Sequence, residues 1–275
     1  MARNGTTIAT GPARVRHAAV AGAFYPGHRQ ELETAIDELL AGATRRGARP
    51  KALVVPHAGY IYSGPVAASA YVQLREPFPT RVVLLGPSHF EPVRGLALPV
   101  ADVFYTPLGD VPVDHHAAAA VAQLGCVKTS AAAHLREHSL EVQLPFLQRV
   151  LPAFTVVPFA VGQARVEDVA AVLDAMWGDR DTLVVISTDL SHYLPYASAQ
   201  ALDAATARDV LALNADGISS DQACGVEGLR GLLSVARQRG LKVEQLDLRN
   251  SGDTAGDHSR VVGYGAFAFY EGEPA

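Results

Sequence analysis

The sequence predicts an α/β fold, a three-layer α/β/α sandwich in which helices cover both faces of a mixed sheet. Short runs rich in β-branched residues alternate with longer segments whose apolar residues recur every three or four positions. The runs KALVVP at 51–56 and TLVVIS at 182–187 are largely apolar, which is typical of strands buried on both faces. No shift in composition suggests a linker, so we expect a flexible tail at 1–12 and one domain at 13–272.

The elements follow in order from these two patterns. The first helix is expected at 28–46, ending at Arg45–Gly47 with cations in its last turn. The second is expected at 64–74, with Ser63 as its N-cap and Pro65 near its first position. Further helices are expected at 114–124, 137–150, 166–177, 199–213 and 226–239, and strands at 51–56, 81–86, 154–161, 182–187, 241–248 and 261–270.

Composition excludes several classes of protein. The formal net charge is −5, so no strong basic field is available for nucleic acid or for an anionic membrane surface. No window reaches the roughly 18 apolar residues of a spanning helix, and residues 1–22 contain no apolar stretch typical of a signal peptide. The two cysteines, Cys126 and Cys224, cannot form a disulfide framework. We therefore expect a cytoplasmic protein.

Common cofactor and nucleophile motifs are missing from the sequence. No G-x-G-x-x-G follows a predicted strand and no Walker loop occurs, which disfavours nicotinamide and nucleoside triphosphate cofactors. No G-x-S-x-G is present, which disfavours an ordinary serine hydrolase.

Polar residues instead follow several predicted strands. His57, His89, the pair Asp189 and His192, and Asp253 each come after a different strand. Open α/β sheets bind ligands at the carboxyl ends of their strands, so we expect these side chains to converge. A single histidine after a strand is more often an ordinary loop or core residue than a ligand. The prediction of a site depends on the recurrence of such residues after four strands. Imidazoles with one carboxylate suit non-haem iron, with copper or zinc as alternatives.

The segment 137–150 offers supporting groups. Glu137 at the start of the helix is favourable for the helix dipole, which is the simpler interpretation. His138 and Glu141 lie three residues apart and share a face, so with Glu137 they are candidates to orient the metal-binding histidines. Pro145 must kink or divide this helix.

Three further residues are candidates for the pocket. Cys224 precedes an amphipathic helix, whose N-terminus would favour a reactive thiol, although a buried cysteine is more often a small apolar residue. Tyr60 and Tyr193 flank the predicted histidines and are candidates to line the site. His258, near Asp253, is a reserve ligand.

The chain resembles the MEMO family, also called the AmmeMemoRadiSam system protein B family. The blocks that carry the resemblance run nearly from end to end, and they are GAFYPG (22–27), VPHAGYIYSG (55–64), LLGPSH (84–89), EHSLEVQLPFL (137–147), STDLSHY (187–193), ACG (223–225) and NSGD (250–253). The resemblance implies a fold similar to class III (LigB-type) extradiol dioxygenases, which cleave catechol rings with non-haem Fe(II). It also implies a functional association with AMMECR1-like and radical-SAM proteins.

The resemblance assigns roles to particular residues. It makes His57 and His89 metal ligands, and it places His192 where the dioxygenases have an acid/base histidine. Asp253 would stand where they have a carboxylate ligand, whereas animal members of the family place a cysteine there. An aspartate favours a harder, oxygen-containing site, and therefore Fe(II) over copper.

These observations together predict a metal-dependent oxidoreductase of dioxygenase-like architecture. His192 would carry a proton, and Asp189 would orient His192 or a metal-bound water. The ligand of the crevice is expected to be a small molecule or a peptide. Two alternatives remain open. The crevice could instead bind a peptide or a partner protein without turnover, with Tyr25, Tyr60 and Tyr62 as contacts, because fold does not fix function. A His/Asp site could also activate water for hydrolysis.

Overall fold

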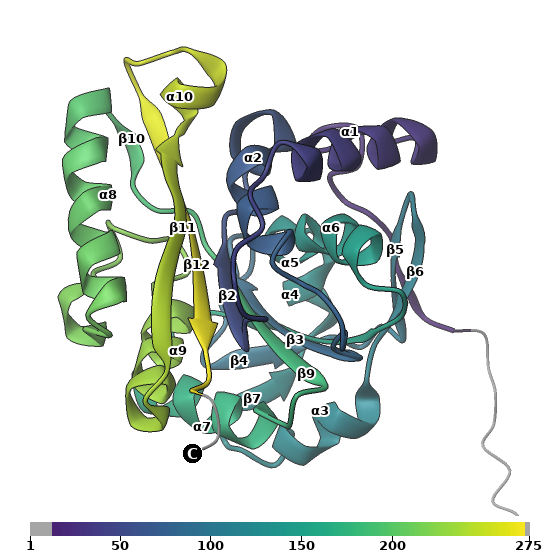
Figure 1. Ribbon diagram of the computed structural model, residues 1–275. Coiled ribbons are helices and arrows are strands. Elements are labelled where there is room, and N and C mark those ends of the chain that lie inside the picture. Colours follow the sequence, from purple (N-terminus) through teal and green to yellow (C-terminus); the bar gives the residue numbers. More distant parts are fainter. Residues whose placement is uncertain (1–12, 273–275) are drawn as a thin grey trace, which may run out of the picture.

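The computed structural model describes residues 13–272, so the tail predicted at 1–12 lies outside the described residues (Figure 1). A three-stranded sheet contains β1 (Val15–Arg16), β5 (Val103–Thr106) and β6 (Gly109–Pro112). The main sheet has nine strands. They are β2 (Ala52–Val55), β3 (Arg81–Pro87), β4 (Leu96–Leu98), β7 (Val127–Thr129), β8 (Thr155–Val161), β9 (Thr182–Ser187), β10 (His192–Leu194), β11 (Lys242–Asn250) and β12 (Val261–Tyr270).

The main sheet is mixed, as the sequence predicts. Its order is β10–β12–β2–β9–β3–β8–β4–β7, and β11 pairs with β12. The central strands β2, β9, β3 and β8 are parallel to one another. Antiparallel pairing of β12 with β2, β10 and β11 completes one side. The carboxyl ends of the parallel strands therefore share one edge of the sheet.

Helices cover both faces of the sheet (Figure 1). Along β2, Leu53 and Val55 enter one core while Ala52 and Val54 enter the other, which is the two-residue period of a strand buried on both sides. The first core contains side chains of α1 (Arg29–Ala41), α2 (Tyr60–Tyr71), α5 (His138–Glu141) and α6 (Gln143–Val150). The second contains side chains of α3 (His115–Val121), α7 (Val166–Met176), α8 (Tyr196–Leu211) and α9 (Val226–Arg239).

Three short helical segments complete the fold: α4 (Ala131–Leu135), the 3-10 turn η1 (Ala215–Gly217) and α10 (Ser251–Ala255). Among residues 13–272, no helix combines the length and the apolar character needed to cross a membrane.

Some predicted boundaries were wrong for local reasons. The first helix ends at Ala41, with Gly42 as its C-cap, rather than at Arg46. Helix α2 begins at Tyr60, with Gly59 rather than Ser63 as its N-cap. Ser63 lies inside the helix, and its hydroxyl donates to the carbonyl of Ala58 at 2.9 Å. The segment 137–150 divides at Val142, which leaves Pro145 in the first turn of α6, where a missing N–H is tolerated.

A buried ion pair attaches the N-terminal segment to α5. Arg16 and Glu141 are both buried and form a salt bridge. The carboxylate of Glu141 also accepts hydrogen bonds from the main-chain N–H of Ala19 (2.7 Å) and Val20 (3.0 Å) and from the hydroxyl of Tyr25 (2.6 Å). Glu141 therefore holds segment 15–25 in place, rather than orienting the metal-binding histidines as the sequence suggested.

Replacing Glu141 should be strongly destabilising. Glu141→Gln removes one charge of a buried pair and leaves Arg16 uncompensated, so we expect the free energy of unfolding to fall by about 3–5 kcal/mol. Urea denaturation followed by circular dichroism measures this change. The exposed Glu38→Gln on α1 is the control and should shift stability by less than about 0.5 kcal/mol. A Glu141→Gln protein as stable as this control would contradict the anchoring role.

His134, at the end of α4, is a second buried group beside this pair. Its main-chain carbonyl accepts a hydrogen bond from Arg16 (2.9 Å), and its Nε2 lies 2.8 Å from the carbonyl of Ala97. Since a carbonyl only accepts, Nε2 carries the proton of a neutral ring. Burial lowers the pKa of His134 to about 4.

This shift makes stability depend on pH. The unfolded chain binds a proton at His134 near pH 6.5, whereas the folded chain resists it until about pH 4, so stability is lost as pH falls through this window. In His134→Gln, the amide keeps the donor to Ala97 without titrating. The stability of the native protein minus that of His134→Gln should therefore fall by about 3 kcal/mol from pH 7 to pH 4. A constant difference across this range would refute the assignment.

Candidate metal centre

Three histidines meet at the carboxyl edge of the parallel strands. His57 follows β2, His89 follows β3, and His138 is the first residue of α5. One ring nitrogen from each lies within 4.8 Å of the others. The rings of His89 and His138 stack with centroids 4.7 Å apart, and His57 meets them edge-on at 5.2 and 5.5 Å. Three imidazoles at this spacing match the donors preferred by zinc, copper, iron and nickel.

The buried carboxylate of Glu137 positions two of these histidines. It accepts hydrogen bonds from the main-chain N–H of His89 (2.6 Å) and of Ser139 (2.9 Å), and it lies 2.9 Å from Nδ1 of His89. Glu137 is also the N-cap of α5, so the same group fixes the helix that begins with His138. Burial raises its pKa, but the hydrogen bond and charge of His89, with the backbone N–H groups, outweigh it and lower the pKa to about 2.

A charged Glu137 determines the tautomer of His89. A carboxylate only accepts, so Nδ1 of His89 must donate its proton to Glu137. When the ring carries no second proton, Nε2 presents a lone pair. Carboxylate groups that fix metal-binding histidines in this way are a common feature of metal sites.

A different network determines the tautomer of His57. Its Nδ1 lies 2.9 Å from the hydroxyl of Ser187, at the end of β9. That hydroxyl donates to the carbonyl of Ser139 (2.6 Å) and accepts from Nε2 of Gln143 (2.8 Å). Gln143 is oriented in turn, because the same Nε2 donates to the carbonyl of Pro56 (2.9 Å). Ser187 has no second proton, so Nδ1 of His57 donates and Nε2 is left as the lone pair.

The environment of the cluster keeps His57 neutral. His57 is buried, and burial together with the charge of His89 lowers its pKa to about 3. The pKa of His138 is lowered to about 4, mainly by burial and then by His57. These rings therefore need not lose a proton near neutral pH before they bind a cation.

Gly86 in β3 permits the close packing that brings α5 to the sheet. A Cβ at Gly86 would lie 2.5 Å from Oγ of Ser139, so a side chain there would push α5 away. The hydroxyl of Ser139 donates to the carbonyl of Pro87 at 3.0 Å, directly ahead of the His89 loop.

Cys224 is next to the cluster, and the predicted ligand set did not include it. Its Sγ lies 3.4 Å from Nε2 of His57 and accepts a hydrogen bond from the N–H of Asp189 at 3.3 Å. Burial, and then the charge of Asp189, raise the pKa of the thiol to about 12, so it is protonated near neutral pH, contrary to the suggested reactive thiol. Sγ is not among the donor atoms that lie within 4.8 Å of one another, so Cys224 contacts the cluster through His57. No local pattern signals this contact, since a long-range contact between Gly225 and Thr188 places the loop.

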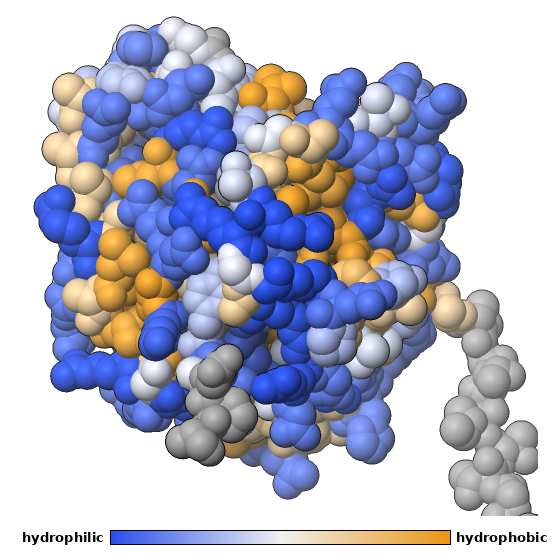
Figure 2. Space-filling view, viewed as in Figure 1, coloured by the Kyte–Doolittle hydropathy of each residue, from blue (hydrophilic) through white to orange (hydrophobic). Residues whose placement is uncertain are grey.

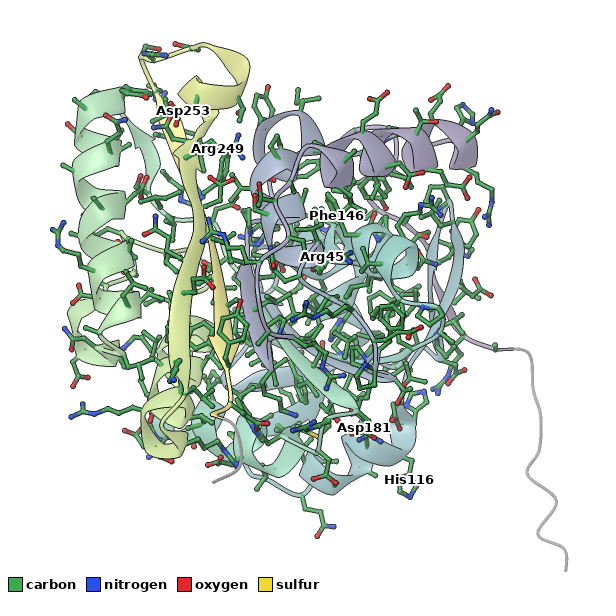
Figure 3. All side chains as sticks on the ribbon, in the orientation of Figure 1. Arg45, His116, Phe146, Asp181, Arg249 and Asp253 are labelled. Carbon is green, nitrogen blue, oxygen red and sulfur yellow. The ribbon has the colours of Figure 1, made fainter. Side chains whose placement is uncertain are left out.

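The structure does not bring Asp253 to the cluster. Its carboxylate belongs to the capping box of α10, where it accepts from the N–H of Asn250 at 2.8 Å and from the hydroxyl of Tyr196. The donor atoms that lie within 4.8 Å of one another belong to His57, His89 and His138, and the carboxylate of Asp253 is not among them. Figure 3 shows Asp253 at the far end of the β11–β12 hairpin. The prediction of Asp253 as a ligand is corrected accordingly. His258 stacks on Tyr196 in the same region.

The proposed proton carrier lies beside the cluster. Nδ1 of His192 lies 2.8 Å from the carbonyl of Leu190, so it donates there and Nε2 is free. The carboxylate of Asp189 accepts from the main-chain N–H of His57 at 2.7 Å, so it positions His57 rather than His192. Burial raises the pKa of Asp189.

The two tyrosines have different surroundings. Tyr60 is a core residue whose hydroxyl donates to the carbonyl of Val142 at 2.8 Å, so it does not line an open pocket. Tyr193 is exposed, adopts a left-handed backbone conformation with φ 58°, and lies under the guanidinium of Arg260.

Comparison with known proteins identifies the family. The model of the Memo family, described as Memo-like protein, matches residues 16–268. The chain belongs to the Memo family. Among its relatives is a MEMO1 family protein of Aquifex aeolicus, 37% identical over 269 residues that cover 91% of this chain and 97% of the relative. Another, from Methanopyrus kandleri, is 36% identical over 281 residues that cover 94% and 99%.

A solved structure supports the fold of this Memo-family chain. An uncharacterized protein from Escherichia coli K12 superposes with a TM-score of 0.51 at 15% identity, covering 78% of this chain and 99% of that chain. At this identity the likeness shows the fold alone.

The hydroxyl of Ser187 should control the tautomer of His57. In protein treated with a chelator, long-range ¹H–¹⁵N spectra of the histidine rings should show His57 protonated at Nδ1 only. Ser187→Ala removes the acceptor, so we expect a mixture of tautomers at His57 while His192 keeps its signals. Ser69→Ala, at a distant serine on α2, is the control. A His57 spectrum that Ser187→Ala leaves unchanged would contradict the network.

Proposed function

We propose that this Memo-family protein is a metal-dependent oxidoreductase whose metal is held by His57, His89 and His138. The observation that supports it is the cluster itself, in which ring nitrogens of three histidines lie within 4.8 Å. The hydrogen bonds at Nδ1 of His57 and of His89 leave Nε2 as the nitrogen that can face a metal. Histidines that bind metals almost always donate their other ring N–H to a partner of this kind.

The donor set determines which metals fit. The sequence favoured a hard metal because it offered Asp253 as a carboxylate ligand, but this carboxylate is used at α10. The neighbouring thiol of Cys224 suits softer metals. We propose Fe(II), with copper as the alternative, because both bind imidazole and change oxidation state. When bound, such a metal would supply electron transfer and Lewis acidity.

The protein's own residues would perform the remaining steps. Glu137 and Ser187 orient the rings of His89 and His57, and Asp189 holds the main chain of His57. We propose that Nε2 of His192 takes a proton from the substrate and later returns it, since an imidazole nitrogen can both accept and donate a proton. His192 is partly exposed, so it can reach a substrate that enters from solvent.

A cleft of about 700 Å³ lies next to the site, and the clustered histidines are not part of its lining. Ser88, next to His89, and Cys224, next to His57, are part of its lining. A small organic molecule fits such a volume. The binding-only alternative used Tyr25, Tyr60 and Tyr62 as contacts. Tyr25 and Tyr60 are buried, whereas Tyr62 is exposed.

Metal binding should depend on the clustered histidines and not on Asp253. We expect His57→Ala and His89→Ala to weaken Fe(II) or Zn²⁺ binding by more than about 100-fold, since even residues that only orient ligands contribute about 10–100-fold. Asp253→Asn should bind within about twofold of the native protein, because its carboxylate is used at α10. Anaerobic competition with a chromophoric chelator measures each affinity. Unchanged affinity in both alanine variants would exclude this centre.

Turnover distinguishes the remaining functions. Protein loaded with Fe(II) or with copper should consume oxygen with some member of a panel of catechols and other phenols, and His192→Gln should lower the rate while it leaves the metal affinity unchanged. Hydrolysis by the zinc form without any oxygen consumption would instead favour the hydrolase. Binding of the panel without turnover would favour a binding module.

A further inference from the structure

A second cleft lies at the opposite edge of the main sheet, where β2 and β9 begin. Its volume is about 680 Å³. Figure 3 labels Asp181, which directly precedes β9, on the lower side of the molecule, whereas Asp253 is at the top. The charged residues of the lining are Arg49, Lys51, Arg180, Arg239 and Glu271. Four cations against one carboxylate give this cleft a local positive charge in a protein whose net charge is −5.

The single carboxylate of the lining is already used by another donor. Glu271 accepts a hydrogen bond from Nε1 of Trp177 at 2.9 Å. Beneath it, the buried ammonium of Lys51 donates to the carbonyls of Trp177 (2.7 Å), Asp179 (2.6 Å) and Thr182 (2.9 Å). These contacts use its three protons, so Lys51 contributes a fixed positive charge under the cleft rather than a direct contact.

Arg49 and Arg180 are the cations available to a ligand. The guanidinium of Arg49 donates to the main-chain carbonyls of Pro77 and Arg180, which holds its plane in place. Among residues 13–272, neither arginine has a carboxylate within ion-pair distance, whereas Arg239 pairs with Asp174 at 2.9 Å. The pKa of Arg49 is lowered first by burial and then by the charge of Arg180, so the two cations repel each other.

We propose that this cleft binds the phosphate groups of a small anionic ligand, with Arg49 and Arg180 as the direct contacts. Two guanidinium groups suit phosphate because each presents paired N–H donors to its oxygens. An anion between them would relieve their repulsion and would also interact with Lys51. Nearby Asp179 and Asp181 attenuate the field without occupying the cleft, since neither belongs to the lining. Figure 2 shows hydrophilic residues gathered over the middle and lower part of the face that it draws.

Calorimetric titration with inorganic pyrophosphate tests the proposal. The protein is first treated with a chelator, because pyrophosphate binds metals and this site is independent of the histidine cluster. Ionic strength is held constant. We expect saturable binding at one site, and Arg180→Met, an exposed change, should weaken it at least tenfold. Arg49→Met should do the same, with circular dichroism to verify its fold.

Two controls make the result specific. Arg237→Met removes an exposed arginine of α9 that does not line the cleft, and it should bind like the native protein. Malonate, a dicarboxylate, should bind at least tenfold more weakly than pyrophosphate. The proposal is overturned if the native protein shows no saturable binding, if Arg237→Met weakens binding as much as Arg180→Met, or if malonate binds as tightly as pyrophosphate.

Discussion

The buried carboxylate of Glu137 is the constraint on which the centre depends. Taking a charge out of water is unfavourable unless hydrogen bonds compensate it, and here the main chain and ring of His89 and the N–H of Ser139 do so. Because one group satisfies both the loop after β3 and the start of α5, these two segments cannot move independently. The positions of His89 and His138 are therefore coupled through it.

A second carboxylate of the same helical segment has a different task. Glu141, four residues after Glu137, lies against Arg16 and the chain that follows β1. Arg16 also donates to the carbonyl of Glu137 at 2.6 Å, so the two acids are linked through one guanidinium. The N-terminal segment thus supports the part of α5 that carries His138, although it provides no residue of the cluster.

The sequence allowed part of this arrangement to be predicted. Apolar runs at 51–56, 81–86 and 182–187 correctly indicated buried parallel strands, and β9 is the only strand between β2 and β3. His57 and His89 are close because the carboxyl ends of β2 and β3, with β9 between them, lie at the same edge of the sheet. Short strands such as β4 and β7 were missed, since three residues carry no readable period.

The remaining parts of the site depend on contacts that no local pattern contains. Asp253 follows a strand as predicted, but its carboxylate is bound in the capping box of α10 rather than in the cluster. Cys224 comes close because Gly225 fits against Thr188, 37 residues earlier. The roles of Ser187 and Gln143 appear only when the donors and acceptors around one hydroxyl are counted.

The same hydrogen bonds determine whether the fold depends on a bound metal. Each group that orients His57 and His89 is itself held by hydrogen bonds within the protein, so the ring positions are determined by the frame. This differs from small zinc domains, whose fold depends on the metal. Here a metal at a free concentration 100 times its dissociation constant would raise the free energy of unfolding of an existing fold by about 2.7 kcal/mol. A frame of this kind would keep its histidines in place whether or not a metal is bound.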